Sequence, residues 1–190
     1  RFPAAGMFLT PAEAPRVAVE SANIGTLEVS AWRLYNNNVP IAALDLGDEG
    51  SFTSWAKPLG SKKYAVGGMV NETARRALDL AGLGCEGEGV YLIEAKNGDP
   101  STWDSARMLL TITDTALSAR MYKRGLQIWA NSISDSKPLA GAEVKVYSSK
   151  NQLLLNGTTD ADGLVSFGVA EGWQDDLQPS LVTVEKEGRL

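Results

Sequence analysis

Short runs of alternating apolar and polar residues, separated by turn-forming residues, recur along the chain. A period of two is the pattern of a strand that buries one face, because successive side chains point to opposite sides. Six such runs fall within about 75 residues of the C-terminal part, and this spacing predicts an immunoglobulin-like β-sandwich. The runs are residues 117–122, 126–130, 144–147, 152–155, 164–167 and 181–184.

The N-terminal part also predicts strands, at residues 7–10, 16–20, 26–35, 89–95 and 108–113. Residues 27, 29 and 31 are expected on one buried face. Residues 89–95 are continuously apolar, which predicts a central strand covered on both faces and paired with residues 108–113 in a hairpin. Residues 74–83 are ambiguous, because their leucines alternate as in a strand while residues 74–80 also suit a helical turn.

One short helix is expected at residues 36–44. An asparagine run supplies a cap, Pro40 falls early, and Ile41 and Leu44 are three residues apart. The strand pattern changes register near Asp114, and 190 residues suit two small sandwiches of ~80–110 residues. The sequence therefore predicts an all-β chain with tandem sandwich domains at residues 1–113 and 114–190, and one short helix in the first.

Composition excludes several classes of function. Histidine is absent from the chain, which removes Ser-His-Asp and Cys-His catalysis and the commonest zinc ligands. The formal net charge of −5 gives no electrostatic reason to approach a phosphate backbone, so no nucleic-acid partner is expected. No apolar run reaches the ~18 residues that span a bilayer. A chain that opens at Arg1 is interpreted as a fragment or a processed product.

The candidate reactive and metal-binding groups all have a structural interpretation. Cys85 is the single cysteine, and we expect neighbouring Glu86 and Glu88 to disfavour its thiolate. Oxygen ligands for calcium are present at residues 160, 162 and 171, but the spacing is that of a turn. The acidic residues Asp45, Asp48 and Glu49 are expected at a solvated loop edge. We therefore predict no catalytic residue, metal ligand or cofactor, and no enzyme.

Tryptophan is the residue type to watch for binding, at Trp32, Trp55, Trp103, Trp129 and Trp173. A buried tryptophan covers a large apolar area, so packing in cores or between domains is favoured over ligand stacking. Trp129 is expected opposite the face that carries residues 126 and 128.

Residues 137–147, followed by residues 158–167, form a recognisable pair of strands. Pro138 and Gly141 shape the entry to a strand that is expected to bury two valines, at 144 and 146. We expect Asp160 and Asp162 to bond nearby backbone amides, with Gly163 at a positive φ. Many extracellular sandwiches share this pairing.

Together with residues 111–117 and 126–132, this segment resembles the junction between macroglobulin-like domains of bacterial α2-macroglobulins. Residues 26–38, 78–80 and 89–94 resemble the domain before that junction, and the resemblance implies that residues 74–80 are extended. Members of the family are large periplasmic proteins that trap proteases after cleavage of a bait segment. Many carry a thioester from a Cys-x-Glu-Gln motif, which Cys85 does not match, so no thioester is expected here.

The resemblance implies a structural fragment of a periplasmic or extracellular, broad-range endopeptidase inhibitor, in which other regions carry the bait and trap. Its partners would be neighbouring domains of the same chain and the target proteases. Any membrane anchor would lie outside this fragment. The alternative is a pair of adhesin-like or carbohydrate-binding sandwiches, which requires exposed tryptophans such as Trp55 and Trp103.

Overall fold

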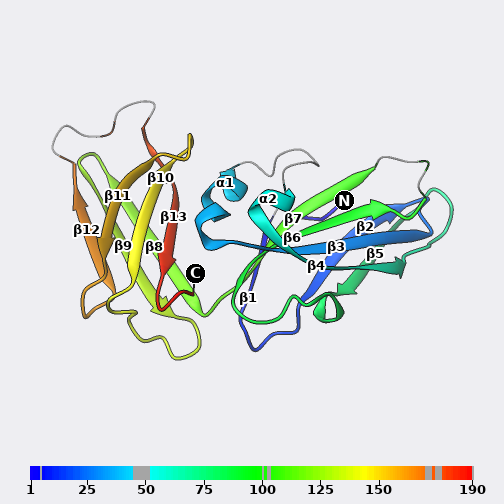
Figure 1. The fold of residues 1–190 in the computed structure, drawn as a ribbon, viewed down its shortest axis with the longest axis horizontal. Coiled ribbons are helices and arrows are strands. Elements are labelled where there is room, and N and C mark those ends of the chain that lie inside the picture. The colour runs from blue at the N-terminus through cyan, green and yellow to red at the C-terminus, as the bar shows by residue number, and fades with distance from the viewer. Residues whose placement is uncertain are drawn as a thin grey trace. The chain divides into compact units, whose positions relative to one another are not determined.

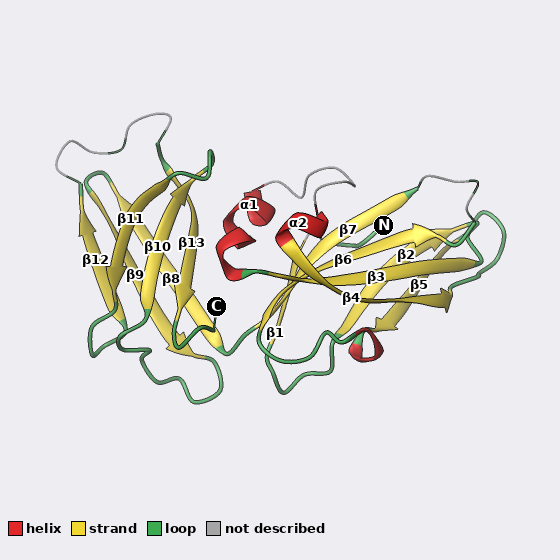
Figure 2. Cartoon of the chain, in the orientation of Figure 1, coloured by secondary structure: helices red, strands yellow, loops and turns green. Residues whose placement is uncertain are grey.

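The computed structural model describes residues 1–4, 6–44, 52–99, 101, 104–169, 173 and 177–189. Strands dominate these residues (Figures 1 and 2), which confirms the all-β prediction. The chain divides into two compact units, and each buries a hydrophobic core of its own. The first unit comprises Arg1–Asn38 and Gly47–Thr113, and the second comprises Val39–Leu46 and Asp114–Leu190.

The first unit contains a five-stranded sheet in the order β1-β7-β6-β3-β4 and a two-stranded sheet of β2 and β5. Neighbouring strands are antiparallel except for β1, which runs parallel to β7. The strands are β1 (Gly6–Leu9), β2 (Arg16–Ala22), β3 (Thr26–Leu34), β4 (Ala56–Ala65), β5 (Thr73–Asp79), β6 (Gly89–Asn97) and β7 (Ser105–Ile112).

Strand β6 is the centre of the larger sheet. Its residues 89–95 are all buried, as the continuous apolar run predicts, because strands flank it and both its faces are covered. The core holds Tyr91 and Ile93 from β6 and Val29 from β3, together with Val17 and Leu78 from the smaller sheet. The predicted face of residues 27, 29 and 31 is buried in the same core.

Strands β5 and β4 of the first unit are the two whose form the sequence did not establish. Residues 73–79 form β5, so the ambiguous segment is extended, and a short 3-10 turn at Ala81–Leu83 follows it. Strand β4 was missed by the sequence prediction, because its residues are mostly exposed and include Pro58 and Gly60. Edge strands tolerate proline, glycine and lysine, since one side of their backbone is left unpaired.

The predicted helix is present as a 3-10 turn at Asn36–Asn38 and α1 (Val39–Leu44). Val39, Pro40 and Ala42 are its buried residues, whereas Ile41 is 41% exposed. Residues 39–46 group with the second unit, where α1 lies beside β13. A second helix that the sequence did not predict, α2 (Phe52–Trp55), precedes β4 in the first unit.

The second unit is a sandwich of two three-stranded antiparallel sheets, in the orders β12-β9-β8 and β11-β10-β13. Leu126, Ile128 and Ala130 of β9 share its core with Val144 and Val146 of β10, as predicted. All six predicted strands are found: β8 (Thr115–Tyr122), β9 (Gly125–Ser132), β10 (Glu143–Ser148), β11 (Leu153–Thr158), β12 (Leu164–Gly168) and β13 (Pro179–Glu185). Among the described residues, no helix is long and apolar enough to cross a bilayer.

Candidate functional site

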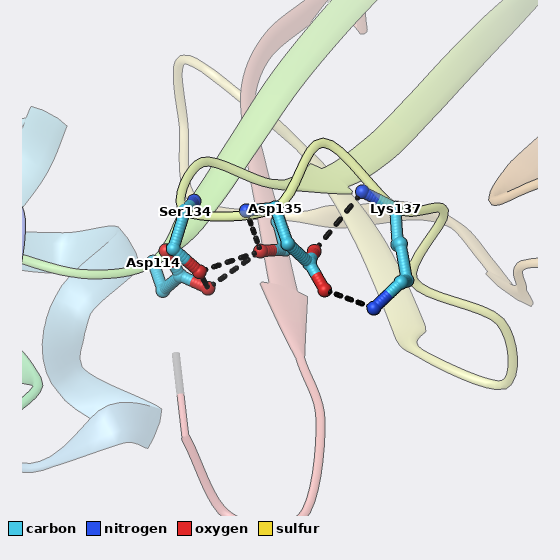
Figure 3. Close-up of polar contacts among 5 residues, drawn as sticks. Asp114, Ser134, Asp135 and Lys137 are labelled. Atoms are coloured by element: carbon cyan, nitrogen blue, oxygen red, sulfur yellow. Dashed lines mark hydrogen bonds and ion pairs between the residues drawn. The ribbon is translucent and has the colours of Figure 1, made fainter.

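Asp114, where the chain enters the second unit again, belongs to a cluster of polar side chains (Figure 3), which we call the Asp114 cluster: Asp114, Ser132, Ser134, Asp135 and Lys137. The Asp114 carboxylate accepts hydrogen bonds from the Ser132 hydroxyl (2.7 Å), the Ser134 N–H (2.8 Å) and the Ser134 hydroxyl (3.0 Å). Ser132 is the last residue of β9, and Ser134 lies in the loop that follows it. The cluster therefore ties Asp114 to the end of β9 and to the loop after it.

Asp135 and Lys137 of the cluster hold the loop after β9 in its turn. Asp135 donates its N–H to the Ser132 hydroxyl (3.3 Å), and its carboxylate accepts from the Lys137 N–H (3.1 Å). The ammonium group of Lys137 lies 2.6 Å from the same carboxylate. Each acidic side chain thus has donors placed against it, as an ionised carboxylate requires.

These hydrogen bonds keep both carboxylates ionised. The pKa of Asp114 lies below its ordinary value, chiefly because Ser132 donates to its carboxylate. The side-chain hydrogen bond from Lys137 is the largest cause that lowers the pKa of Asp135, to about 2. A general acid or base works best with a pKa near the operating pH. The cluster is therefore suited to holding a loop in place and not to moving protons.

Main-chain hydrogen bonds complete the attachment on either side of residue 114. The carbonyl of Asp114 accepts from the Ile133 N–H (2.7 Å) inside the second unit. Thr113, the last residue of the first unit, donates its N–H to the carbonyl of Leu9 (2.9 Å). Consecutive residues are thus anchored to different units. The sequence predicted a domain boundary near Asp114, where the strand pattern changes register.

The turn considered for calcium binding is built from backbone hydrogen bonds, as predicted. Oδ1 of Asp160 accepts from the N–H groups of Asp162 and Leu164, each at 2.9 Å. Gly163 has φ +71°, as the predicted turn requires. Asp162 donates its main-chain N–H in this turn, so the expectation that its own carboxylate bonds backbone amides is wrong. Four acidic residues lie outside the described part of the chain: Glu171, Asp45, Asp48 and Glu49. Among the residues that the structure describes, no three acidic or thiol side chains lie close enough together to hold a metal ion.

Cys85 is a core residue and not a reactive thiol. Its side chain is fully buried in the first core, and burial raises the pKa of the thiol to about 12. The sequence predicted an inert thiol for a different reason, namely repulsion by Glu86 and Glu88. That reason is wrong, because desolvation alone accounts for the raised pKa.

Trp32, Trp55, Trp129 and Trp173 are half-buried, and Trp103 lies outside the described residues. Trp129 alternates with buried Ile128 on β9, as predicted. Trp173 packs against the second core, and its indole N–H donates to the carbonyl of Tyr122 (3.1 Å). The four described tryptophans thus form no exposed row of the kind that glycan stacking needs.

A small hollow opens in the first unit. Its volume is about 130 Å³, and its lining includes Val19, Ser21, Leu27 and Ala106. Ser21 Oγ is buried there with no hydrogen-bond partner among the described residues. Pockets for drug-sized ligands usually enclose ~300–1,000 Å³. The hollow is suited to a few water molecules, which would also satisfy the serine hydroxyl.

Comparison with known proteins gives these features a context. Residues 112–190 match a family model described as the bacterial alpha-2-macroglobulin MG3 domain. Over 180 residues, 90% of its length, the chain is 22% identical to alpha-2-macroglobulin of Escherichia coli strain K12. These similarities support a fragment of a bacterial alpha-2-macroglobulin, with residues 112–190 matching its MG3 domain. A Yersinia pestis alpha-2-macroglobulin homolog is 27% identical over 123 residues, or 62% of the chain.

Solved structures of alpha-2-macroglobulins share the fold. The native Escherichia coli fragment spanning domains MG0-NIE-MG1 has a TM-score of 0.82 at 20% identity and matches 99% of this chain and 60% of that one. The fragment spanning NIE-MG1 has a TM-score of 0.80 at 20% identity, over 99% of this chain and 92% of that one. Salmonella alpha-2-macroglobulin reacted with methylamine has a TM-score of 0.74 at 19% identity, and the match covers 98% of this chain and 11% of that one.

The chain is a small part of its full-length alpha-2-macroglobulin relatives. It covers 10% of the Escherichia coli protein and 6% of the Yersinia pestis homolog. The resemblance inferred from residues 111–117, 126–132, 137–147 and 158–167 is confirmed, because the matched MG3 domain covers all of these residues except residue 111.

Proposed function

We propose that this chain is a structural segment of a bacterial, periplasmic alpha-2-macroglobulin-like protein, a broad-range endopeptidase inhibitor. Bait cleavage and trapping of the protease are the work of other regions of that protein. The match of residues 112–190 to an alpha-2-macroglobulin domain carries this proposal, together with the chain's small share of the full-length relatives. In this role each unit acts as a rigid beam that holds more distant elements at fixed spacing.

The separate cores and the Asp114 cluster support the role of rigid beams. Each unit buries its own apolar residues, so each can keep its shape while the protein rearranges. The hydrogen bonds of Thr113 and Asp114 anchor these two residues to different units. At this crossing, bending is therefore concentrated in the peptide unit between them.

The chemistry of the side chains supports a role without catalysis. Histidine is absent from the chain, and burial keeps the thiol of Cys85 protonated at neutral pH. The carboxylates of Asp114 and Asp135 have lowered pKa values and serve as hydrogen-bond acceptors. None of these groups is a nucleophile beside a base. We accordingly propose that the segment is not an enzyme.

The proposed partners are the neighbouring domains of the same polypeptide and, for the whole protein, its target proteases. The net charge of −5 argues against nucleic acid as a partner. The periplasm, or the outer surface of the cell envelope, is the proposed location. Any membrane anchor is assigned to regions outside this chain.

The first test uses the chain alone. It is mixed in equimolar amounts with several unrelated endopeptidases, and hydrolysis of a large protein substrate is measured. We expect no inhibition, because the bait and trap are assigned elsewhere. Tight stoichiometric inhibition by these 190 residues would contradict the proposal.

The second test uses the full-length parent protein. Insertion of Gly-Gly-Ser between Thr113 and Asp114 is expected to weaken its inhibition of proteases, because the anchored crossing becomes a flexible linker. The same insertion between Lys150 and Asn151, two exposed residues of the turn after β10, is the matched control and is expected to leave inhibition unchanged. Equal inhibition by both insertion variants would count against the role as a rigid beam.

A further inference from the structure

The hollow in the first unit results from small side chains that meet at one end of its core. Ala95 of β6 lies directly opposite Ala106 of β7, and both line the hollow. The next core-facing pair on the same strands is Ile93 and Met108, whose larger side chains are buried. Ser21, from the other sheet of the unit, continues the row of alternating buried residues along β2. Small residues in both sheets thus leave a space that larger residues fill one step further along.

The buried end of the hollow offers few hydrogen-bond partners to water. Val19, Leu27 and Ala95 belong to its apolar wall. Ser21 is 6% exposed, and its Oγ has no hydrogen-bond partner among the described residues. The other polar residues of the described lining are exposed or half-buried, so they lie toward the solvent. A buried water needs about two to four polar partners, so water molecules held here are poorly bound and an apolar group readily displaces them.

The volume and the chemistry of the hollow define a small ligand. Its volume of about 130 Å³ is too small for a drug-sized molecule, but it is close to the ~150 Å³ of an engineered apolar cavity that binds benzene. An ionic ligand is disfavoured, because the described residues at the buried end include no charged group to replace its lost hydration. One hydroxyl on the ligand can satisfy Ser21, whose own hydroxyl both donates and accepts. The hollow is therefore matched to one neutral ring that carries one hydroxyl group.

We propose that this hollow is a binding site for small neutral aromatic alcohols, of which phenol is the simplest. The ring displaces the poorly bound water and contacts Val19, Leu27 and Ala95, and the hydroxyl exchanges a hydrogen bond with Oγ of Ser21. A ligand of this size is expected to bind with a Kd on the order of 1 mM. The site lies within the first unit, so this inference does not rest on the proposed inhibitor role.

Titration of the whole chain with phenol, followed by its backbone amide NMR signals, tests the site. Up to about ten times the expected Kd, saturable shifts are expected at Ser21, Leu27 and Ala95, while the second unit serves as the internal control and keeps its signals. Ala106→Leu fills the hollow and is expected to weaken binding about tenfold or more. Ala77→Leu alters an exposed alanine of β5 and is expected to keep the wild-type affinity. Shifts no larger near the hollow than in the second unit would mean that it holds solvent only, and would overturn the proposal.

Benzene, which lacks the hydroxyl group, tests the contact with Ser21. In Ser21→Ala the ratio of the Kd values for phenol and benzene is expected to shift about fivefold against phenol, the factor that one ordinary hydrogen bond contributes. This variant is expected to fold, because it removes a buried hydroxyl that has no partner among the described residues. Ser118→Ala, which alters an exposed serine of β8, is the control and is expected to keep the wild-type ratio. An unchanged ratio in Ser21→Ala would overturn the proposed contact and, with it, the assigned class of ligand.

Discussion

The hydroxyl of Thr159 donates a hydrogen bond of 2.5 Å to the carbonyl of Leu139, twenty residues earlier in the chain. The same hydroxyl accepts a hydrogen bond of 2.9 Å from the N–H of Ala142. Thr159 is 4% exposed, so water does not readily replace these partners. One buried side chain therefore joins the approach to β10 to the end of β11.

Replacing this hydroxyl by a methyl group is the first prediction. Thr159→Val is expected to lower the free energy of unfolding by ~1–3 kcal/mol, since a buried carbonyl and a buried N–H lose their partner. Urea denaturation measures the change. Thr158→Val alters the exposed neighbour and is expected to have almost no effect. Equal destabilisation by the two variants would show that the hydrogen bonds of Thr159 contribute nothing specific.

A second prediction compares two glycines that both have positive φ. A Cβ at Gly163 would lie 2.4 Å from the carbonyl oxygen of Ala130, whereas one at Gly141 meets no atom within 4 Å. Gly141→Ala is expected to cost ~1–2 kcal/mol for the left-handed backbone alone. Gly163→Ala carries the clash in addition, so its melting temperature is expected to fall clearly further. The reverse order would contradict the geometry of the turn.

A third prediction follows from the two separate cores. Ile128 and Leu110 are both fully buried, the first in the second core and the other in the first core. Each change to alanine is expected to destabilise its own unit by ~2–5 kcal/mol. Fluorescence and calorimetric unfolding curves are expected to show one transition shifted and the other unchanged in each variant. A single transition that moves equally in both variants would mean that the cores unfold as one.

The fourth prediction concerns pH. The folded pKa of Asp114 is lowered, so its stabilising effect is present above the ordinary carboxyl pKa and is lost as the pH falls through the folded pKa. The melting temperature of the wild type is therefore expected to fall more steeply between pH 5 and pH 2 than that of Asp114→Asn. Asp162→Asn, which removes an exposed carboxylate in a turn, is expected to follow the wild-type profile. Parallel profiles for wild type and Asp114→Asn would refute the assigned role of Asp114.

The fifth prediction tests the thiol. Burial raises the pKa of Cys85 to about 12, so almost no thiolate is present at pH 8. A disulfide reagent is expected to leave the native chain unlabelled and to label it stoichiometrically in concentrated urea. Rapid labelling of the native chain would contradict the burial of this side chain.

The pattern of apolar residues along the sequence predicted the strands that bury one or both of their faces. β6 and β9 are examples, because their burial follows directly from their apolar pattern. β4 escaped prediction because it is an edge strand with few buried residues, so pairing and not hydrophobic pattern determines its extended form. The sequence analysis attributed the inert thiol of Cys85 to its acidic neighbours, whereas burial in the core is the cause. Burial could not be predicted, because it depends on contacts between segments that are distant in the sequence.

The Asp114 cluster was beyond sequence reasoning for a related reason. Its acceptor and its serine donors are separated by a complete hairpin, and only the pairing of β8 with β9 brings them together. Polar residues in a turn carry no periodic signal that identifies such a distant partner. The turn at Asp160 was predictable, because its acceptor and donors lie within four residues of one another.

The parallel pairing of β1 with β7 sets an order on the assembly of the first unit. Gly6 lies opposite Leu109, so β1, which is synthesised before the other strands of this unit, has no partner until about a hundred more residues have followed. Closing so long a loop is entropically costly, and contacts of this kind slow folding. The N-terminal strand must therefore wait as an unpaired segment, and this is the interval in which chaperones have most reason to bind the nascent polypeptide.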